Sequence, residues 1–428
     1  MLGNIRTLLK RKDAVLHEGR LGLIANQVAF DFTSGRYLHE LLHERGVLKT
    51  LFLPEHGLFA ELQDQEPLID GSVYGLSGSG GAGGAPEAGE GLNVVSLYGR
   101  DEESLRPAPE LVRGLDGLVI ALQDVGVRYY TFAVTVAYFL EELALSAPSC
   151  RVYVLDSPNP AGRRVEGTLL PESYASFVGY PGLPQRHGLT LGELLLYLRE
   201  ARSWPLELEI LPPETPTSEM PASGAPVFGA PVFGASSAPY FIWPSPNMPG
   251  ELTPRLYSGQ CLLEGTNLSE GRGTTRPFEI WGAPYLRVFD AAREKPPEQR
   301  GGLLRPLRFL PTFHKFAGEV CQGAQIHLLS EEYHSLAHTL KLIRWARENH
   351  PEFEFRRGVY EFRSDRPAIE ILAGDDVLLE YLRGEASFQR VREALQEGEE
   401  AWRARASRYL LYDGSLQRTE LDPGEDYC

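Results

Sequence analysis

Short apolar segments rich in β-forming residues recur through the first half of the chain, and stretches with helical periodicity separate them. Five segments are expected to form strands, at residues 21–25, 48–53, 93–98, 117–123 and 151–156. Three stretches are expected to form helices, at residues 36–46, 131–146 and 189–201, the last with Thr190 as its N-cap. Such alternation is typical of parallel strands joined by crossover helices. The sequence therefore predicts an α/β domain built on a doubly wound parallel sheet.

The length of the chain predicts a second domain. At 428 residues it exceeds the size at which one hydrophobic core usually keeps growing. Residues 212–239 are rich in proline, contain the tandem repeat GAPVF-GAPVF and follow neither regular period, so we expect a loop or linker there. A strand signal at residues 325–329 and a long charged helix near residues 385–407 then indicate a smaller α+β domain. We predict domains at residues 1–235 and 236–428.

Composition narrows the classes of partner. The formal net charge is −16 and the isoelectric point is about 5.2. A nucleic acid or an anionic membrane would need a clustered basic face, which this charge disfavours. No apolar run approaches the ~20 residues that cross a bilayer, and no secretory signal pattern is seen, so we expect a cytoplasmic protein without membrane insertion. The four cysteines are widely spaced, which favours reduced, mostly buried thiols.

Polar residues directly follow three of the predicted strands. In a doubly wound sheet, ligands bind beyond the carboxyl ends of the strands, so these residues are candidate site residues. Glu55 and His56 follow the strand at 48–53, in the motif PEHG. Asp124 and Arg128 follow the strand at 117–123, and Asn159 follows the strand at 151–156. The alternative for Glu55 is that its carboxylate only caps the next helix.

A second polar segment, CLLEGTNLSEGRGTTRPFEIWGAP, occupies residues 261–284 and carries more charged groups than core packing explains. Its candidate site residues are Glu264, Asn267, Glu270, Arg272, Thr275, Arg276 and Glu279. Burying such a segment is costly unless its groups find partners. Because an arginine can hold a carboxylate through two parallel hydrogen bonds, we interpret the segment as a recognition surface. A solvated loop is the alternative.

Shorter motifs suggest other chemistries but lack the context that those chemistries need. HELLH at residues 39–43 matches the zinc-hydrolase pattern, yet its leucines fit a crossover helix with His39 and His43 on or near the polar face. GSGGAG at residues 78–83 matches the dinucleotide-binding pattern, but no predicted strand precedes it and no helix follows, so we expect a surface loop. His334 and His338, also one turn apart, are expected to be exposed helix residues.

Seven longer motifs run in order along nearly the whole chain, from about residue 20 to about residue 410. They are LFLPEHG, VSLYGR, LQDVGVRYYTF, LDSPNPAG, HGLTLGEL, WPSPNMP and EGTNLSEGRGTTRPFEIWGAP. Together they resemble the NamZ-like exo-β-N-acetylmuramidases. The resemblance implies a Rossmann-like N-terminal domain and a smaller C-terminal domain, with a cleft between them for the non-reducing end of a muropeptide glycan. It implies no nicotinamide cofactor.

The resemblance also implies a catalytic role for the glutamate of the PEHG motif, which is Glu55 here. We expect Glu55 to act as the general acid, with His56 and the low dielectric of the cleft adjusting its protonation. Glycoside hydrolysis usually needs a second carboxylate as base or nucleophile. The candidates for it are Asp124, Glu264, Glu270 and Glu279. Attack by the substrate's own 2-acetamido group, with one essential acid, is the alternative.

Selectivity for N-acetylmuramic acid requires a positive group, because this sugar carries a lactyl carboxylate that N-acetylglucosamine lacks. Arg128, Arg272 and Arg276 are the candidates. Further expected substrate contacts are Tyr129, Asn159, Asn247, Asn267, Thr275 and Glu279. Tyr130 and Trp243 are further aromatic candidates for facing the sugar ring.

The resemblance thus implies an exo-acting glycoside hydrolase that releases terminal N-acetylmuramic acid from cell-wall fragments, and we expect it to use neither a metal nor a cofactor. Three alternatives are a zinc hydrolase using HELLH, a non-catalytic muropeptide-binding module and, weakest, a nucleotide-binding oxidoreductase. The sequence does not indicate an oligomeric state. The main prediction requires that Glu55 and residues 264–279 face one shared crevice.

Overall fold

A six-stranded parallel sheet organises the first part of the chain in the computed structural model, which describes residues 4–63, 66, 92–213, 242–419 and 421. Its strands are β1 (Leu21–Ala25), β4 (Leu48–Leu53), β5 (Asn93–Ser96), β6 (Gly117–Ala121), β7 (Arg151–Leu155) and β9 (Leu208–Leu211). They lie in the order β5-β4-β1-β6-β7-β9, and every neighbouring pair is parallel. Counted along the chain this is the order 3-2-1-4-5-6 of Rossmann folds. The predicted doubly wound sheet is confirmed.

All five predicted strands are present, and β1 and β4 match their predicted bounds. The sixth strand, β9, was not predicted. It lies at the edge of the sheet, where Glu207 and Glu209 interrupt a short apolar run and only Leu211 is fully buried. A charged, half-exposed edge strand gives a weaker sequence signal than a strand buried on both faces.

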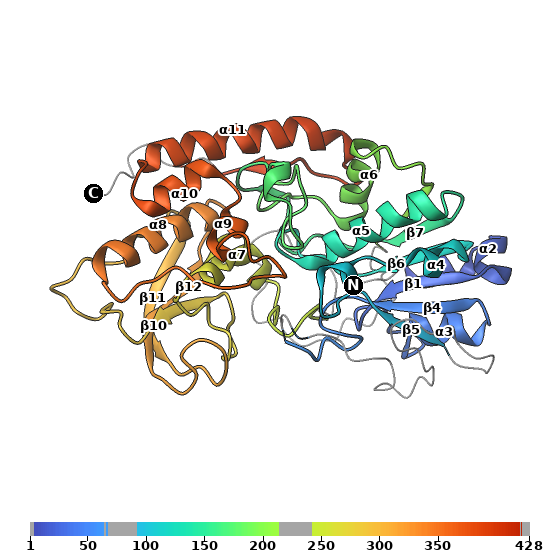
Figure 1. The fold of residues 1–428 in the computed structure, drawn as a ribbon, viewed down its shortest axis with the longest axis horizontal. Coiled ribbons are helices and arrows are strands. Elements are labelled where there is room, and N and C mark those ends of the chain that lie inside the picture. The colour runs from blue at the N-terminus through green and yellow to red at the C-terminus, as the bar shows by residue number, and fades with distance from the viewer. Residues whose placement is uncertain (1–3, 64–65, 67–91, 214–241, 420, 422–428) are drawn as a thin grey trace, which may run out of the picture.

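Helices cover both faces of the sheet (Figure 1). One face packs on a core with residues of α1 (Ile5–Lys10), α2 (Ala14–Glu18) and α3 (Leu38–Glu44). The other face packs on a core with residues of α4 (Pro109–Arg113), α5 (Thr131–Ser146) and α6 (Leu191–Ala201). Successive strand residues point to opposite sides, so Leu51 joins the first core and Phe52 the second.

The predicted helix starts and faces are partly confirmed. Thr190 caps α6 as expected, because its hydroxyl accepts the backbone N–H of Glu193 at 3.2 Å. The HELLH helix is α3, but the interpretation of His39 as a polar-face residue was wrong. His39 is only 5% exposed and stacks on Tyr37 with ring centroids 5.6 Å apart, whereas His43 is exposed. The GSGGAG string and the predicted domain boundary lie outside the described residues.

The second part of the chain is a smaller α+β unit. Its antiparallel sheet has the order β10-β12-β11 and consists of β10 (Ile280–Ala283), β11 (Gly302–Phe309) and β12 (Cys321–Leu328). Its helices are α7 (Thr253–Gln260), α8 (Ser335–Asn349), α9 (Ala368–Ala373), α10 (Asp376–Arg383) and α11 (Phe388–Ala406). The predicted strand and charged helix correspond to β12 and α11. No described helix is both long and apolar enough to span a bilayer.

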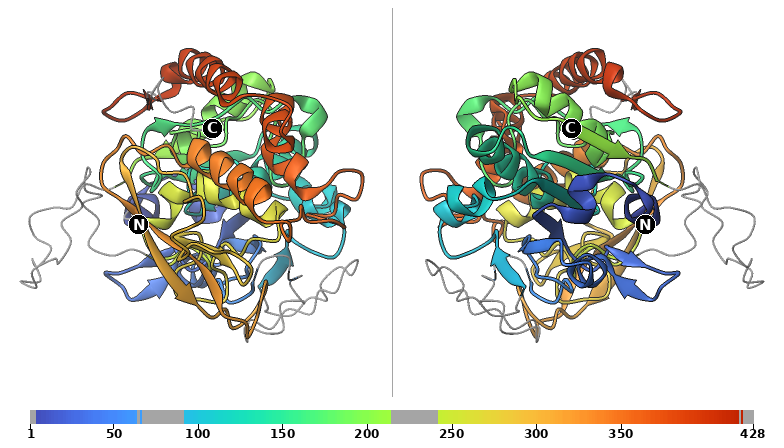
Figure 2. Two further views of the ribbon diagram at one scale, coloured as in Figure 1. Left: turned by 90° about the vertical axis from the view of Figure 1, so that its left-hand side faces the viewer. Right: turned by 90° about the vertical axis from the view of Figure 1, so that its right-hand side faces the viewer.

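Helix α11 ties the two parts together. It starts beside α10, runs back over the first part and reaches α6, and both end-on views place it along the outer edge of the molecule (Figures 1 and 2). Trp402 of α11 is fully buried and donates its indole N–H to the carbonyl of His187 at 2.7 Å. The two parts therefore share one continuous core on that face of the sheet.

A buried ionic cluster lies where the two parts meet. Arg186 Nη1 lies 2.7 Å from Glu166 Oε1 in the first part. His334, the N-cap of α8, lies 3.4 Å from Glu166 and 2.9 Å from Glu399 of α11. The expectation that His334 and His338 are exposed was wrong, because both are buried; His338 is held between Tyr333 and the carbonyl of Pro297.

This cluster predicts a pH-dependent contribution to stability. Burial lowers the pKa of His334, but the attraction of Glu166 and the hydrogen bond to Glu399 outweigh it and raise the pKa above 6.5. A histidine whose pKa is higher in the folded than in the unfolded protein stabilises the fold at pH values below its unfolded-state pKa. This stabilisation is lost as the pH rises through the folded-state pKa.

The substitution His334→Gln should therefore lower the free energy of unfolding by about 3–5 kcal/mol at about pH 6, because buried carboxylates lose their cation. The loss should be smaller at about pH 9. Urea denaturation of both proteins at both pH values measures it. Equal losses at the two pH values would contradict the assignment of charge to His334.

Candidate active site

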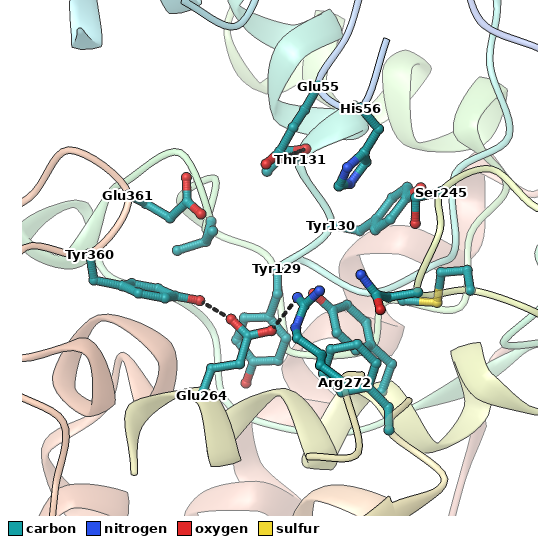
Figure 3. A pocket seen from close by; sticks show the side chains of 15 residues that line it. Glu55, His56, Tyr129, Tyr130, Thr131, Ser245, Glu264, Arg272, Tyr360 and Glu361 are labelled. Carbon is teal, nitrogen blue, oxygen red and sulfur yellow. Dashed lines mark hydrogen bonds and ion pairs between the residues drawn. The ribbon is translucent and has the colours of Figure 1, made fainter. Parts of the chain in front are cut away.

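One pocket brings together the two polar segments that the sequence analysis selected. It has a volume of about 440 Å³ including its open mouth. Glu55 and His56 line it from the first part, and Glu264 and Arg272 line it from the second (Figure 3). Tyr129 and Asn247 also line it. The shared crevice on which the main prediction depends is therefore present.

The topology of the sheet explains why Glu55 lies at this pocket. It follows β4, which neighbours β1, and the strand order reverses between β1 and β6. The carboxylate accepts the hydroxyl of Thr131 at 2.8 Å. Thr131 is the first residue of the 16-residue helix α5, so the carboxylate lies beside the N-terminus of that helix. Glu55 is 4% exposed.

The residues around Glu55 hold a sharp turn. His56 adopts φ 74° and Gly57 φ 84°, both in the left-handed region. His56 Nδ1 lies 3.0 Å from the carbonyl of Leu62, which fixes the imidazole beside the pocket. Asn26, directly after β1, donates to the carbonyl of Pro244 at 3.0 Å. This contact brings the segment with Ser245, Asn247 and Met248 to the same edge of the sheet.

Arg272 connects two buried glutamates. Its Nη2 lies 2.8 Å from Glu264 Oε1, and its Nε lies 3.4 Å from Glu270 Oε1. Burial raises the pKa of Glu270, but Lys315, His314 and Arg272 outweigh burial and hold that pKa well below its usual range. Glu270 is therefore a fixed anion that orients Arg272.

Tyr360 completes the surroundings of Glu264. Burial raises the pKa of Tyr360 well above its usual value, so the phenol keeps its proton and donates it to Glu264 Oε2 at 2.6 Å. Glu264 thus lines the pocket with both oxygens engaged, one by Arg272 and one by Tyr360. This arrangement suits an orienting carboxylate better than one that reacts.

Backbone strain gathers at this pocket. Eight described residues other than glycine have positive φ, and three of them, His56, Phe278 and Glu361, line the pocket. Each such residue costs about 1–3 kcal/mol and persists only where surrounding contacts enforce it. Strain of this kind is common at functional sites, so its location agrees with the pocket being the site.

Several predicted site residues lie away from the pocket and have internal partners. Asp124 is buried and accepts the N–H of Gly126 at 2.7 Å. Arg128 is buried, and its Nη atoms donate to the carbonyls of Thr168, Leu183, Leu372 and Ala373. Asn159 donates to the carbonyl of Leu189 and accepts the N–H of Ala161. We therefore assign these three residues to the scaffold.

The same holds for part of the second polar segment. Asn267 binds the carbonyl of Glu352 and the hydroxyl of Tyr285. Glu279 is buried and accepts the hydroxyl of Thr253. Thr275 is exposed, and the side chain of Arg276 is 59% exposed and pairs with Glu279. Trp243 is 49% exposed and does not line the pocket.

The sequence analysis missed part of the pocket. Thr131, Ser245, Met248 and Phe278 lie within motifs that it quoted, but no role was assigned to them. Tyr257 lies in a helix, and its sequence context is that of a core residue. Tyr360 and Glu361 lie in no quoted motif, because the tip of their turn is formed by Glu361 and Phe362 and not by the asparagine or glycine that usually marks such a turn. Only the fold brings this turn to the pocket.

Among the described residues, no group of three or more histidine, cysteine, aspartate or glutamate side chains is arranged to hold a metal ion. His39 and His43 of the HELLH motif differ in exposure and do not converge with further ligands.

Comparison with known proteins places this geometry in a family. The profile of the N-terminal part of exo-β-N-acetylmuramidase NamZ matches residues 21–251, and that of its C-terminal part matches residues 255–412. The chain belongs to the NamZ family. It is 30% identical to the peptidoglycan β-N-acetylmuramidase NamZ of Bacillus subtilis strain 168 over 413 residues, which is 95% of this chain and 90% of that protein. The resemblance stated from the motifs is confirmed.

Two solved structures support the fold of this NamZ-family chain. Both are DUF1343 family proteins of Bacteroides fragilis NCTC 9343, each 24% identical to it. The match to the first has a TM-score of 0.73 and covers 96% of this chain and 98% of the solved chain. The match to the second has a TM-score of 0.64 and covers 94% of this chain and 96% of the solved chain. At this identity they show the shared fold and nothing more.

The position of Arg272 yields a stability prediction. Arg272→Met removes the cation between two buried carboxylates and should lower the free energy of unfolding by about 3–5 kcal/mol. Arg276→Met is the matched control, because this exposed arginine should contribute less than about 1 kcal/mol. Urea denaturation measures both. Similar losses of stability in the two variants would contradict the prediction that the buried ion pairs of Arg272 stabilise the fold.

Proposed function

We propose that the protein is an exo-β-N-acetylmuramidase that releases terminal N-acetylmuramic acid from the non-reducing end of peptidoglycan fragments. The observation that carries the proposal is the pocket in which Glu55 of the first part meets Glu264 and Arg272 of the second. Membership of the NamZ family supplies the reaction class. Fragments consisting of N-acetylmuramic acid linked to N-acetylglucosamine are the proposed substrates.

Glu55 is the proposed general acid. Its carboxyl group is nearly enclosed, lies at the carboxyl end of a central strand and is oriented by Thr131. A general acid must reach the glycosidic oxygen and give it a proton as the bond to the sugar breaks. His56, fixed by the turn, lies next to it in the pocket wall. In this proposal, the proton for the glycosidic oxygen comes from Glu55, a residue of the first part of the chain.

Arg272 is the proposed partner of the lactyl carboxylate. Two glutamates hold its guanidinium in one orientation, and its Cζ lies 5.0 Å from the centre of the Phe278 ring. A guanidinium fixed in advance loses little freedom on binding, and its planar donors fit a carboxylate. Of the three arginines that the sequence suggested, it is the one that lines the pocket. Tyr129 and Asn247 are proposed as further contacts with the sugar.

The proposed reaction needs neither a metal nor a cofactor. We also propose that the protein acts in the cytoplasm. A chelator should leave activity unchanged, whereas a zinc hydrolase would lose it. A non-catalytic module would bind the disaccharide but release no sugar. Incubation with MurNAc-GlcNAc followed by mass spectrometry separates these functions, and failure to release N-acetylmuramic acid would refute the proposal.

The role of Glu55 is tested by Glu55→Gln, which keeps the shape of the side chain but removes the proton donor. The turnover number on MurNAc-GlcNAc should fall by roughly 10²–10⁴-fold, while the melting temperature changes little. Glu110→Gln is the control, because the side chain of Glu110 is 74% exposed and lies outside the pocket. A Glu55→Gln enzyme with near-normal turnover would remove this residue from the mechanism.

The role of Arg272 is tested by Arg272→Lys, which keeps the charge but loses the planar pair of donors. The ratio of kcat/KM for β-MurNAc over β-GlcNAc chromogenic substrates should fall roughly tenfold or more, since one hydrogen bond to a charged group contributes about 1.5–3 kcal/mol. Arg276→Lys should leave the ratio unchanged. An unaltered ratio in Arg272→Lys would assign the carboxylate to another group.

A further inference from the structure

A strained turn in the second part carries a carboxylate into the pocket. Tyr360 and Arg363 exchange two backbone hydrogen bonds, each of 2.9 Å, so Glu361 and Phe362 form the tip of a two-residue hairpin. Both tip residues have positive φ, 45° and 64°. This is the pattern of a type I′ turn, which strongly favours Asn-Gly. Glutamate and phenylalanine are poor choices for such a turn on local grounds.

Contacts on all sides hold the turn in place. Tyr360 donates to Glu264, and Arg363 Nη1 donates to the carbonyl of Ala175 at 2.7 Å. Tyr98, which follows β5 in the first part, donates its hydroxyl to Glu361 Oε2 at 3.3 Å. The ring of Tyr98 also packs against that of Phe362, with centroids 5.5 Å apart. The turn is thus fixed to both parts of the chain, and Glu361 is only 7% exposed.

The other carboxylates suggested by the sequence fit a reacting role less well. Asp124, Glu270 and Glu279 do not line the pocket, and Glu264 is engaged by Arg272. Glu55 and Glu361 line the pocket from different parts of the chain, and Figure 3 shows both side chains directed into the space above Tyr129. Glu55 accepts the hydroxyl of Thr131, and Glu361 accepts that of Tyr98.

We propose that Glu361 is the catalytic base that acts with Glu55, an inference that rests on the proposed function. Glu55 gives its proton to the glycosidic oxygen as the bond from that oxygen to C1 breaks. The oxygen of one water molecule forms the new bond to C1, and the proton lost by this water goes to Glu361. One water is consumed, and no atom is oxidised or reduced.

The variant Glu361→Asn separates chemistry from folding, because asparagine suits the left-handed turn better than glutamate. The melting temperature should stay the same or rise, while kcat on a β-MurNAc chromogenic substrate falls by roughly 100-fold or more with KM little changed. Ser203→Asn is the control: Ser203 also has positive φ, 54°, is exposed and lies outside the pocket. It should keep wild-type kcat.

Chemical rescue tests the position of Glu361. In Glu361→Ala, sodium azide should restore turnover and form the α-azide of N-acetylmuramic acid, since azide attacks C1 and needs no base. NMR of the wild-type reaction should show α-MurNAc first. Near-normal kcat in Glu361→Asn, absence of the α-azide, or β-MurNAc as the first product would each overturn the base role. A wild-type enzyme that releases no N-acetylmuramic acid would instead refute the proposed function.

Discussion

The two parts of the chain are joined by buried charge. Glu166 and Arg186 belong to the first part, His334 and Glu399 to the second, and all four side chains lie within the protein. Separating the parts would break the contacts of Glu166 with His334 and with the backbone N–H of Leu336, and the contact of Glu399 with the backbone N–H of Gly167. The pocket needs residues from both parts, so its geometry depends on this junction.

The pocket itself follows the same principle. Arg272 is held by Glu264 and Glu270, and Glu270 in turn by Lys315. Such a network orients its members before a ligand arrives, because moving one group would break several interactions at once. In the same pocket, Glu55 accepts the hydroxyl of Thr131 and Glu361 accepts that of Tyr98.

The sequence predicted those features that depend on local patterns. The buried strands and the N-cap at Thr190 follow from periodicity and capping chemistry. Glu55 could be found because parallel strands place their following residues at a common edge. The arginines could not be ranked, because the composition around Arg128 and Arg272 does not show which carbonyls or carboxylates will surround them. Glu361 was missed for a related reason: four long-range contacts, and not its neighbours in sequence, hold its turn in place.

Helix α11 adds a constraint on how the molecule is made. It comes late in the chain, yet Trp402 and Glu399 contact residues near positions 187 and 167 of the first part. Domains commonly fold in order as they leave the ribosome. The strands of the parallel sheet and the residues that line the pocket precede this helix in the chain, so its contacts with the first part form after both have been synthesised.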